Sequence, residues 1–217
     1  MAVACNSDRP QAYAIIRAGA QQYGSYSSAW LMTWRWEDWF MSGIEGSKRS
    51  LNILAATGLA LGGVFGLAGT MTSQPNLQAV AWGIDSCGLV MACALLTLKF
   101  HKMGSEIVSG GFLVFGIGEG VILSGTAAGA SASVPSFGAG VALWATGLLL
   151  ISMPRQFPIW VRTFGIVASA LFLITAARIF WGEQVLPTAS PLPFFAYPFL
   201  VVTFAGWIWA LLRESPA

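Results

Sequence analysis

Three ionisable side chains lie inside long apolar stretches, and their types and positions are the ones in this sequence that could do chemistry. Asp85, Glu119 and Arg178 each fall in a different stretch. A charged side chain near the middle of a bilayer costs about 2.5 to 3.5 kcal/mol on insertion scales, so each acid needs a partner or a water-filled pocket. The sequence therefore predicts that Arg178 pairs with Glu119 or Asp85. Gly118 and Gly120 are expected to leave room beside the glutamate.

This candidate intramembrane cluster has two main interpretations. In the first, the three side chains form a buried hydrogen-bonded network that fixes helix packing, as polar groups commonly do between membrane helices. In the second, two acids that share one arginine keep a proton that can titrate, and they line an outward-facing cavity for an ion or small polar ligand. A catalytic acid pair is a third alternative, although no histidine, nucleophile or metal ligand accompanies it. We therefore expect no catalytic residue, no cofactor and no enzymatic activity.

Metal and disulfide chemistry find little support in the composition. His101 is the single histidine, which excludes bis-histidine haem ligation and histidine-rich zinc sites within one chain. Cys87 and Cys93 are six residues apart on one predicted helix, so their side chains are related by a rotation of about 240° around the axis and cannot form a local disulfide. The formal net charge of +2 is too small to indicate binding to nucleic acid.

The elements that must position the ionisable residues are membrane-spanning helices. Of the 217 residues, 56% are hydrophobic and 9% are charged, whereas soluble domains carry roughly 25% charged residues. Six apolar segments are each long enough to cross roughly 30 Å of hydrocarbon at about 1.5 Å per residue, and backbone groups in lipid must be paired within a helix. The predicted fold is therefore an all-α, polytopic transmembrane bundle. Its spans cover residues 51–72, 77–98, 104–127, 134–153, 158–181 and 192–212.

The basic residues predict how the spans are oriented. With the N-terminus inside, ten of the eleven lysines and arginines lie on the cytoplasmic side and only Arg178 lies toward the other. The positive-inside rule then places both termini in the cytoplasm (N-in/C-in), and the short connections predict three antiparallel hairpins. Asp85, Glu119 and Arg178 fall roughly 21, 25 and 30 Å from the cytoplasmic boundary, in the outer part of the bundle. Compact helices, short loops and the lack of a cleavable leader favour the plasma membrane, specifically a bacterial inner membrane.

Residues 1–50 form a segment distinct from the bundle, expected in the cytoplasm or at the membrane interface, and residues 213–217 form a cytoplasmic tail. The N-terminal segment contains four closely spaced tryptophans, Trp30, Trp34, Trp36 and Trp39. Tryptophan is enriched at membrane–water interfaces, which favours a helix lying at headgroup level. Docking onto another membrane protein is the alternative.

Glycines at helical spacing predict close packing of helices. They are Gly58, Gly62 and Gly66 in the first span, and Gly116 and Gly120 in the third. Small residues repeated every four positions allow helix backbones to approach each other in a membrane. Two interpretations stay open, namely packing inside the monomer and self-association through the first span.

A further polar contact is predicted near the cytoplasmic boundary of the third span. Glu106 lies within reach of Arg162 or His101, and an ion pair with Arg162 is the first interpretation, with a gate as the second. Asn52, at the start of the first span, suits a helix cap or a polar contact.

Two functions from different classes follow from these features. The first expectation is a non-enzymatic structural or accessory subunit that binds other membrane proteins, through its tryptophan-rich N-terminal segment. The alternative is a small proton-linked transporter or permeation protein that uses Asp85, Glu119 and Arg178. The expected partners are the lipid bilayer and, as alternatives, other membrane proteins or a second copy of this chain.

Overall fold

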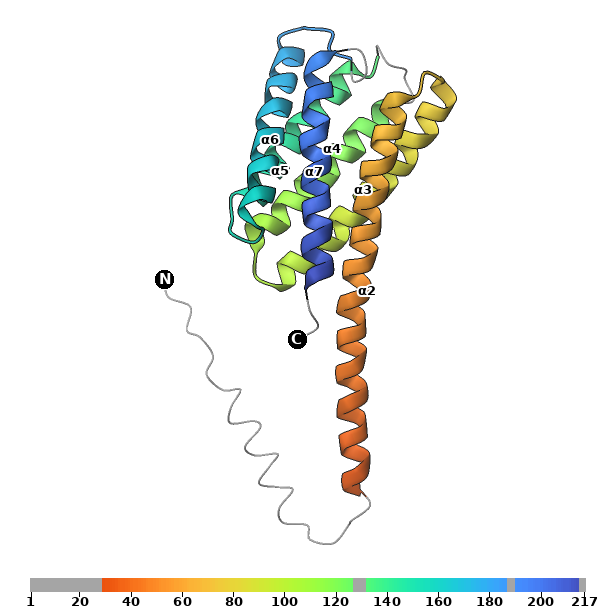
Figure 1. Ribbon diagram of the computed structural model, residues 1–217, viewed down its shortest axis with the longest axis vertical. Coiled ribbons are helices and arrows are strands. Elements are labelled where there is room, and N and C mark those ends of the chain that lie inside the picture. Colours follow the sequence, from red (N-terminus) through yellow and green to blue (C-terminus); the bar gives the residue numbers. More distant parts are fainter. Residues whose placement is uncertain (1–28, 127–131, 187–189, 215–217) are drawn as a thin grey trace. The chain divides into compact units, whose positions relative to one another are not determined.

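The computed structural model describes residues 29–126, 132–186 and 190–214, with side chains from Arg49 onward in these ranges (Figure 1). This described part consists of helices and their connections, without a strand. The helices are α2 (Ala29–Met71), α3 (Pro75–Lys102), α4 (Glu106–Thr126), α5 (Val134–Ser152), α6 (Ile159–Phe180) and α7 (Pro191–Arg213).

Six helical stretches are long and apolar enough to cross a membrane: Arg49–Met71 within α2, and α3 to α7 over their whole lengths. This confirms the predicted all-α class for the described residues and the prediction of six helices long and apolar enough to span a membrane, and it supports a multi-pass membrane protein. Large apolar side chains are exposed along the outer helix faces, where they would meet lipid. They include Ile53, Leu54, Val64, Leu113, Ile117, Leu173 and Ile174.

Most span boundaries differ from the predicted ones by one or two residues, and the largest difference lies at the end of α3. That helix continues to Lys102, four residues beyond the predicted end, because a helix can extend past the apolar boundary when its last side chains are basic and reach water. Gly104 then ends it with a φ of 73°, a left-handed conformation that glycine adopts without strain.

Contacts divide the chain into two units, residues 1–47 and residues 48–217. The second unit contains the six candidate spans. Within the N-terminal segment, α2 begins at Ala29. The side chains of Trp30, Trp34, Trp36 and Trp39 lie outside the described ones, so their interfacial or docking role stays a prediction.

Consecutive helices of the second unit run in opposite directions (Figure 1), and glycines bring their backbones together. A Cβ atom built on Gly118 of α4 would lie 2.8 Å from the carbonyl oxygen of Gly140 of α5, and the reverse distance is also 2.8 Å. Gly147 of α5 approaches the Gly111 carbonyl in the same way, again at 2.8 Å. The α4–α5 pair therefore packs backbone against backbone, as small residues allow in membranes.

The glycines of the first span face α3. Cβ atoms built on Gly58 and Gly62 would lie 2.5 Å from the Gly88 carbonyl oxygen and 2.3 Å from Leu89 Cδ2, respectively. Gly66 would approach the Asp85 carboxylate at 3.0 Å. This face of α2 is therefore occupied within the chain, which favours packing inside the monomer over self-association.

The glycines predicted to pack on the third span behave differently from each other. Gly116 lies against Cys93 of α3, whose Cβ would be 2.9 Å from a Cβ on the glycine, whereas no atom lies within 4 Å of the corresponding position on Gly120. The prediction that Gly120 packs a neighbouring helix is therefore wrong. Its spacing from Gly116 puts it on the same side of α4, but the space beside it is open.

A polar contact joins three helices at the end of the bundle where α3 ends, which we call the Lys99 end. Lys99 Nζ donates to Asn52 Oδ1 at 2.8 Å and forms an ion pair with Glu214 at 2.5 Å. Asn52 Nδ2 donates to the Leu211 carbonyl oxygen and to Glu214 Oε2, each at 3.1 Å. Asn52 thus satisfies groups from α3 and α7, in keeping with its predicted polar contact.

Replacing Asn52 by alanine should lower the free energy of unfolding by about 1 to 2 kcal/mol, because Lys99, with a side chain only 10% exposed, loses a hydrogen-bond acceptor. Denaturant titration in detergent micelles measures the change. The matched control is Thr57→Ala, since the Thr57 hydroxyl is exposed and bonds only to its own helix at Ile53. An equal loss in both variants would contradict a role for the Asn52 contact.

The predicted ion pair between Glu106 and Arg162 is wrong. Arg162 Nε donates to the Ser152 carbonyl oxygen at 2.8 Å, and Nη2 donates to the Met153 carbonyl oxygen at 2.7 Å. Glu106 is exposed in the first turn of α4. The last carbonyl groups of a helix have no partner within it, so α5 offers the arginine nearer acceptors than the exposed carboxylate does.

Candidate functional site

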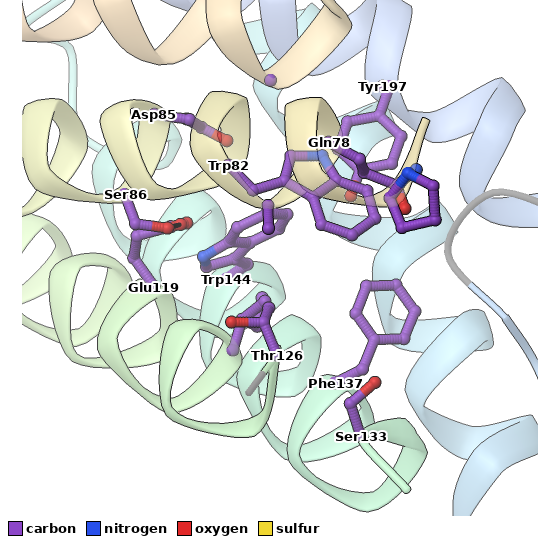
Figure 2. A pocket seen from close by; sticks show the side chains of 14 residues that line it. Gln78, Trp82, Asp85, Ser86, Glu119, Thr126, Ser133, Phe137, Trp144 and Tyr197 are labelled. Atoms are coloured by element: carbon purple, nitrogen blue, oxygen red, sulfur yellow. Dashed lines mark hydrogen bonds between the residues drawn. The ribbon is translucent and has the colours of Figure 1, made fainter. Parts of the chain in front are cut away.

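A cavity of about 290 Å³ lies among α2, α3, α4, α5 and α7 (Figure 2). It reaches from Pro75, exposed at the start of α3, to the buried side chains of Asp85 and Glu119. We call the side of the bundle at which α3 begins the Pro75 end. The cavity therefore lies toward this end, opposite the basic residues of the Lys99 end.

Helical spacing explains why α3 and α4 present acids to the cavity. On α3, Gln78, Trp82 and Asp85 follow each other by four and three residues, so they share one helix face, and all three line the cavity. On α4, Phe112, Phe115 and Glu119 are spaced in the same way and all are buried. Two aromatic residues thus fix the face of α4 that carries the glutamate inward.

Glu119 is the most deeply buried acid of the described chain, with only 2% of its surface exposed. Its Oε1 accepts a hydrogen bond of 2.5 Å from the Ser86 hydroxyl, shown as a dashed line in Figure 2. Its Oε2 has no hydrogen-bond partner in the described structure. One carboxylate oxygen is thus held by α3, and the Glu119 carboxylate also interacts with the indole N–H of Trp144.

Asp85 lies beside this group with 9% of its surface exposed, and its Oδ1 also has no hydrogen-bond partner. The two carboxyl groups are close enough for their charges to repel each other. The described lining of the cavity contains no lysine, arginine or histidine. Two like charges at a shared buried site cannot both persist unpaired, so a proton or a bound cation must neutralise at least one of them.

Arg178 does not belong to this site, and the prediction that it pairs with Glu119 or Asp85 is wrong. Its Nη2 forms an ion pair of 2.5 Å with Glu183, and its Nε donates to the same carboxylate at 2.7 Å. Both side chains are about half exposed. Arg178 stands in the last turn of α6, where a carboxylate five residues later is reached in the open without stripping water from the guanidinium.

Gly118 does not leave room beside the glutamate either. Besides the Gly140 carbonyl, a Cβ on Gly118 would meet Leu143 Cβ and Trp144 Cδ1, each at 2.9 Å. The glycine is needed because α5 comes close at this point. The space beside Glu119 is instead the cavity, which is lined by residues of α2, α3, α4, α5 and α7.

Four aromatic side chains form much of the cavity wall: Trp82 of α3, Phe137 and Trp144 of α5, and Tyr197 of α7 (Figure 2). The buried Trp144 indole N–H points toward the Glu119 carboxylate and interacts with it, although the contact does not reach full hydrogen-bond geometry. Trp144 and Tyr197 pack edge to face, with ring centroids 6.3 Å apart. The cavity thus has a largely aromatic wall and an acidic floor, which is formed by Asp85 and Glu119.

Some of these residues could have been found from the sequence and others could not. The shared face of Gln78, Trp82 and Asp85 is visible in their spacing, and Ser86 adjoins the aspartate. Trp144 and Tyr197 come from spans far along the chain and carry no local signal. Their place in the wall depends on how α5 and α7 are rotated about their axes.

Buried aromatic rings separate the cavity from the Lys99 end. We call Phe100, Phe112, Phe115, Phe157 and Trp207 the aromatic plug, and each is at most 7% exposed. Phe115 stacks on Trp144 of the cavity wall with centroids 5.4 Å apart, and Phe112 lies edge to face with Trp207 at 4.9 Å. Phe100 continues the series beyond Phe112, at 5.5 Å. The floor of the cavity is therefore backed by packed rings.

Replacing Gly66 by alanine should disturb the acid pair, because the new Cβ would lie 3.0 Å from Asp85 Oδ2. We expect slower modification of the cavity carboxyl groups by a hydrophobic carbodiimide, measured by peptide mass mapping. The matched control on the same helix is Gly63→Ala, whose nearest neighbour, Phe204 Cδ2, is 3.9 Å away. Equal modification rates in the two variants would show that Gly66 does not position Asp85.

Chemically, the arrangement offers negative charge at the floor of a partly aromatic cavity and a short path to one end of the bundle. Such a site suits a proton or a positively charged ligand, because either one removes the repulsion between the two acids. Comparison with protein-family models, with curated proteins and with solved structures finds no match to this chain.

Proposed function

We propose that this chain is a small proton-linked transporter or permeation protein that takes up its cation at Asp85 and Glu119. The observation that carries the proposal is the position of the Glu119 carboxylate. It lines the cavity although Glu119 is only 2% exposed, and its Oε2 forms no hydrogen bond of full geometry. Ionisable groups inside a membrane bundle commonly mark ion or substrate paths. Burying them costs free energy, so they are rare where they serve no function.

The proposed orientation is N-in and C-in, with α2–α3, α4–α5 and α6–α7 as three hairpins. Basic residues gather at the Lys99 end, which supports a cytoplasmic position for it under the positive-inside rule. In the described chain they are Arg49, Lys99, Lys102, Arg155, Arg162 and Arg213. The cavity would then open away from the cytoplasm. A bacterial inner membrane is the location that we propose, given how short the described connections are.

The coupling between proton and ligand follows from the acid pair. When the cavity is empty, one proton shared by Asp85 and Glu119 limits their repulsion. A monovalent cation that enters takes over this role, so it displaces the proton, and the charge of the site stays the same. Exchange of one for the other at a single site is the simplest way in which this geometry links proton and cation movement.

An accessory role gives no reason for a cavity that holds two buried acids and no basic residue among its described lining. It would depend on Trp30, Trp34, Trp36 and Trp39 as a docking segment. A gentle detergent pull-down would favour it if a second protein were recovered in stoichiometric amount and lost when these tryptophans are replaced. A chain recovered alone favours the transport proposal.

The experiment that tests the proposal measures proton flux. The purified chain is reconstituted in liposomes that enclose a pH-sensitive dye, and a pH step is applied with and without K⁺ or an organic cation on the opposite side. We expect faster pH equilibration than in protein-free liposomes, and we expect a hydrophobic carbodiimide to abolish it while mass mapping places the adduct on Glu119 or Asp85. Equilibration no faster than in protein-free liposomes under every gradient would refute the proposal.

A further inference from the structure

We infer that the cation taken by this cavity is a small organic ammonium ion. This inference rests on the proposed function and narrows it to one chemical class of ligand. It is carried by the aromatic wall, since the acidic floor alone would suit any cation. The wall consists of Trp82, Phe137, Trp144 and Tyr197 (Figure 2).

The faces of aromatic rings attract organic cations. An ammonium group within about 6 Å of a ring centroid is stabilised by the ring quadrupole, and tryptophan is the most effective ring. Aromatic cages around quaternary ammonium groups are the best-known use of this effect. Two of the four wall residues here are tryptophans, and they come from different helices, α3 and α5.

The positions of these rings are fixed by packing. Trp82 rests against Gly69 of α2, whose Cβ would lie 2.5 Å from the ring atoms Cδ1 and Nε1. Trp144 is stacked on Phe115 and meets Phe172 edge to face at 5.3 Å. Rings that are already held in place lose little conformational freedom when a ligand binds, which raises affinity.

The size of the cavity favours an organic ion over a bare one. Pockets for small molecules run from about 300 to 1,000 Å³, and this cavity measures about 290 Å³. A proton alone requires no such space. A dehydrated metal ion requires oxygen ligands on all sides at roughly 2.0 to 2.6 Å, whereas aromatic side chains make up much of this wall. Among the described residues, no group of three His, Cys, Asp or Glu side chains could hold a metal.

The cavity is also ordered along its length in the way that such a ligand needs. Asp85 and Glu119 lie at the buried floor, and Gln78 lies toward the Pro75 end. A cationic head can therefore reach the carboxylates while its alkyl groups contact the rings. The free-energy cost of desolvating a methylated ammonium head is small, because such ions are weakly hydrated compared with metal ions. Contacts with the aromatic wall can therefore replace the lost contacts with water.

The test is calorimetric titration of the purified full-length chain in detergent with tetramethylammonium, choline and n-butylammonium. The neutral isostere of choline, 3,3-dimethylbutan-1-ol, serves as the ligand control. We expect at least one of the ammonium ions to bind, and the isostere to bind at least about tenfold more weakly, because it has the shape but lacks the charge. Glu119→Gln should abolish binding of the ammonium ion.

Two tryptophan variants separate the wall from general effects. Trp82→Leu should weaken binding of the ammonium ion by about tenfold, and Trp82→Phe should weaken it less, since phenylalanine keeps a ring of smaller quadrupole. The matched control is Trp181→Leu, because Trp181 is 84% exposed just after α6 and lies outside the cavity lining. If Trp82→Leu does not fold, the Trp82→Phe titration carries the comparison.

Three results would overturn the inference: none of the three ammonium ions binds, the neutral isostere binds equally well, or the Trp82 variants bind as tightly as the unchanged chain. The proton-flux measurement distinguishes this failure from failure of the proposed function. Carbodiimide-sensitive proton flux without ammonium binding refutes the ligand class and leaves proton-linked transport in place. If neither proton flux nor ammonium binding is observed, the proposed function and the ligand class are both refuted.

Discussion

Glu119→Gln is expected to reduce proton flux through reconstituted protein to the level of protein-free liposomes. Glutamine has the same shape and can keep the contact with Ser86, whose hydroxyl donates to Oε1 in the present structure. It cannot carry a negative charge or exchange a proton. The variant should therefore fold and lose function, and its thermal unfolding midpoint should be unchanged or higher, because a buried charge has been removed.

Two further variants define how specific this effect is. Asp85→Asn should lower the flux without abolishing it, since Asp85 is the less buried of the two acids and Glu119 remains to exchange a proton. Glu106→Gln is the matched control, because Glu106 is exposed on the same helix and does not line the cavity. Flux in Glu119→Gln equal to that of the Glu106→Gln control would show that the buried glutamate does not take part in transport.

The second large effect concerns stability. Gly147→Ala is expected to destabilise the bundle by about 1 to 3 kcal/mol, the usual cost of inserting a group into a well-packed interior. The new Cβ would lie 2.8 Å from the Gly111 carbonyl oxygen, 2.8 Å from Phe115 Cβ and 2.9 Å from Phe115 N. These are backbone atoms or atoms fixed to the backbone, so α4 and α5 would have to move apart.

Gly110→Ala provides the control for this prediction. Gly110 is on α4 within one residue of Gly111, but no atom lies within 4 Å of its Cβ position. Alanine favours helix by up to about 1 kcal/mol over glycine, so this variant should be as stable as the unchanged chain or slightly more so. Denaturant titrations in the same detergent compare the two. Similar stabilities would mean that the α4–α5 contact tolerates a methyl group.

The spans were predictable from the sequence because the length of an apolar run is a property of one segment alone. The proximity of Asp85 to Glu119 was predictable for a related reason: the sequence places both residues at a similar depth, on spans that follow each other. Depth is one coordinate, however, and it does not give the face of the helix. This is why Arg178, assigned to the same outer part, was wrongly paired with these acids when Glu183 lies closer in the chain.

The aromatic wall could not be predicted in the same way. Nothing next to Trp144 or Tyr197 in the sequence distinguishes them from the other buried aromatic residues of the bundle. The Trp144 side chain reaches the cavity because α5 packs on α4 through Gly118 and Gly140, and this contact sets the rotation of α5. Tyr197 belongs to α7 and is held beside it by edge-to-face packing on Trp144 and Phe172. Glycines at helical spacing in a sequence indicate that another helix packs closely there, but they do not identify which helix it is.

The aromatic plug has an electrical consequence. Packed rings between the cavity floor and the Lys99 end offer a hydrated ion no continuous water column, so a bilayer that contains the chain in this conformation should remain an insulator. In the proposed transport, each crossing would have to wait for these rings and their helices to rearrange, which would place turnover on the microsecond-to-millisecond timescale of collective motions. Patch-clamp recordings should accordingly show no unitary current steps, even from membranes in which the dye assay records exchange.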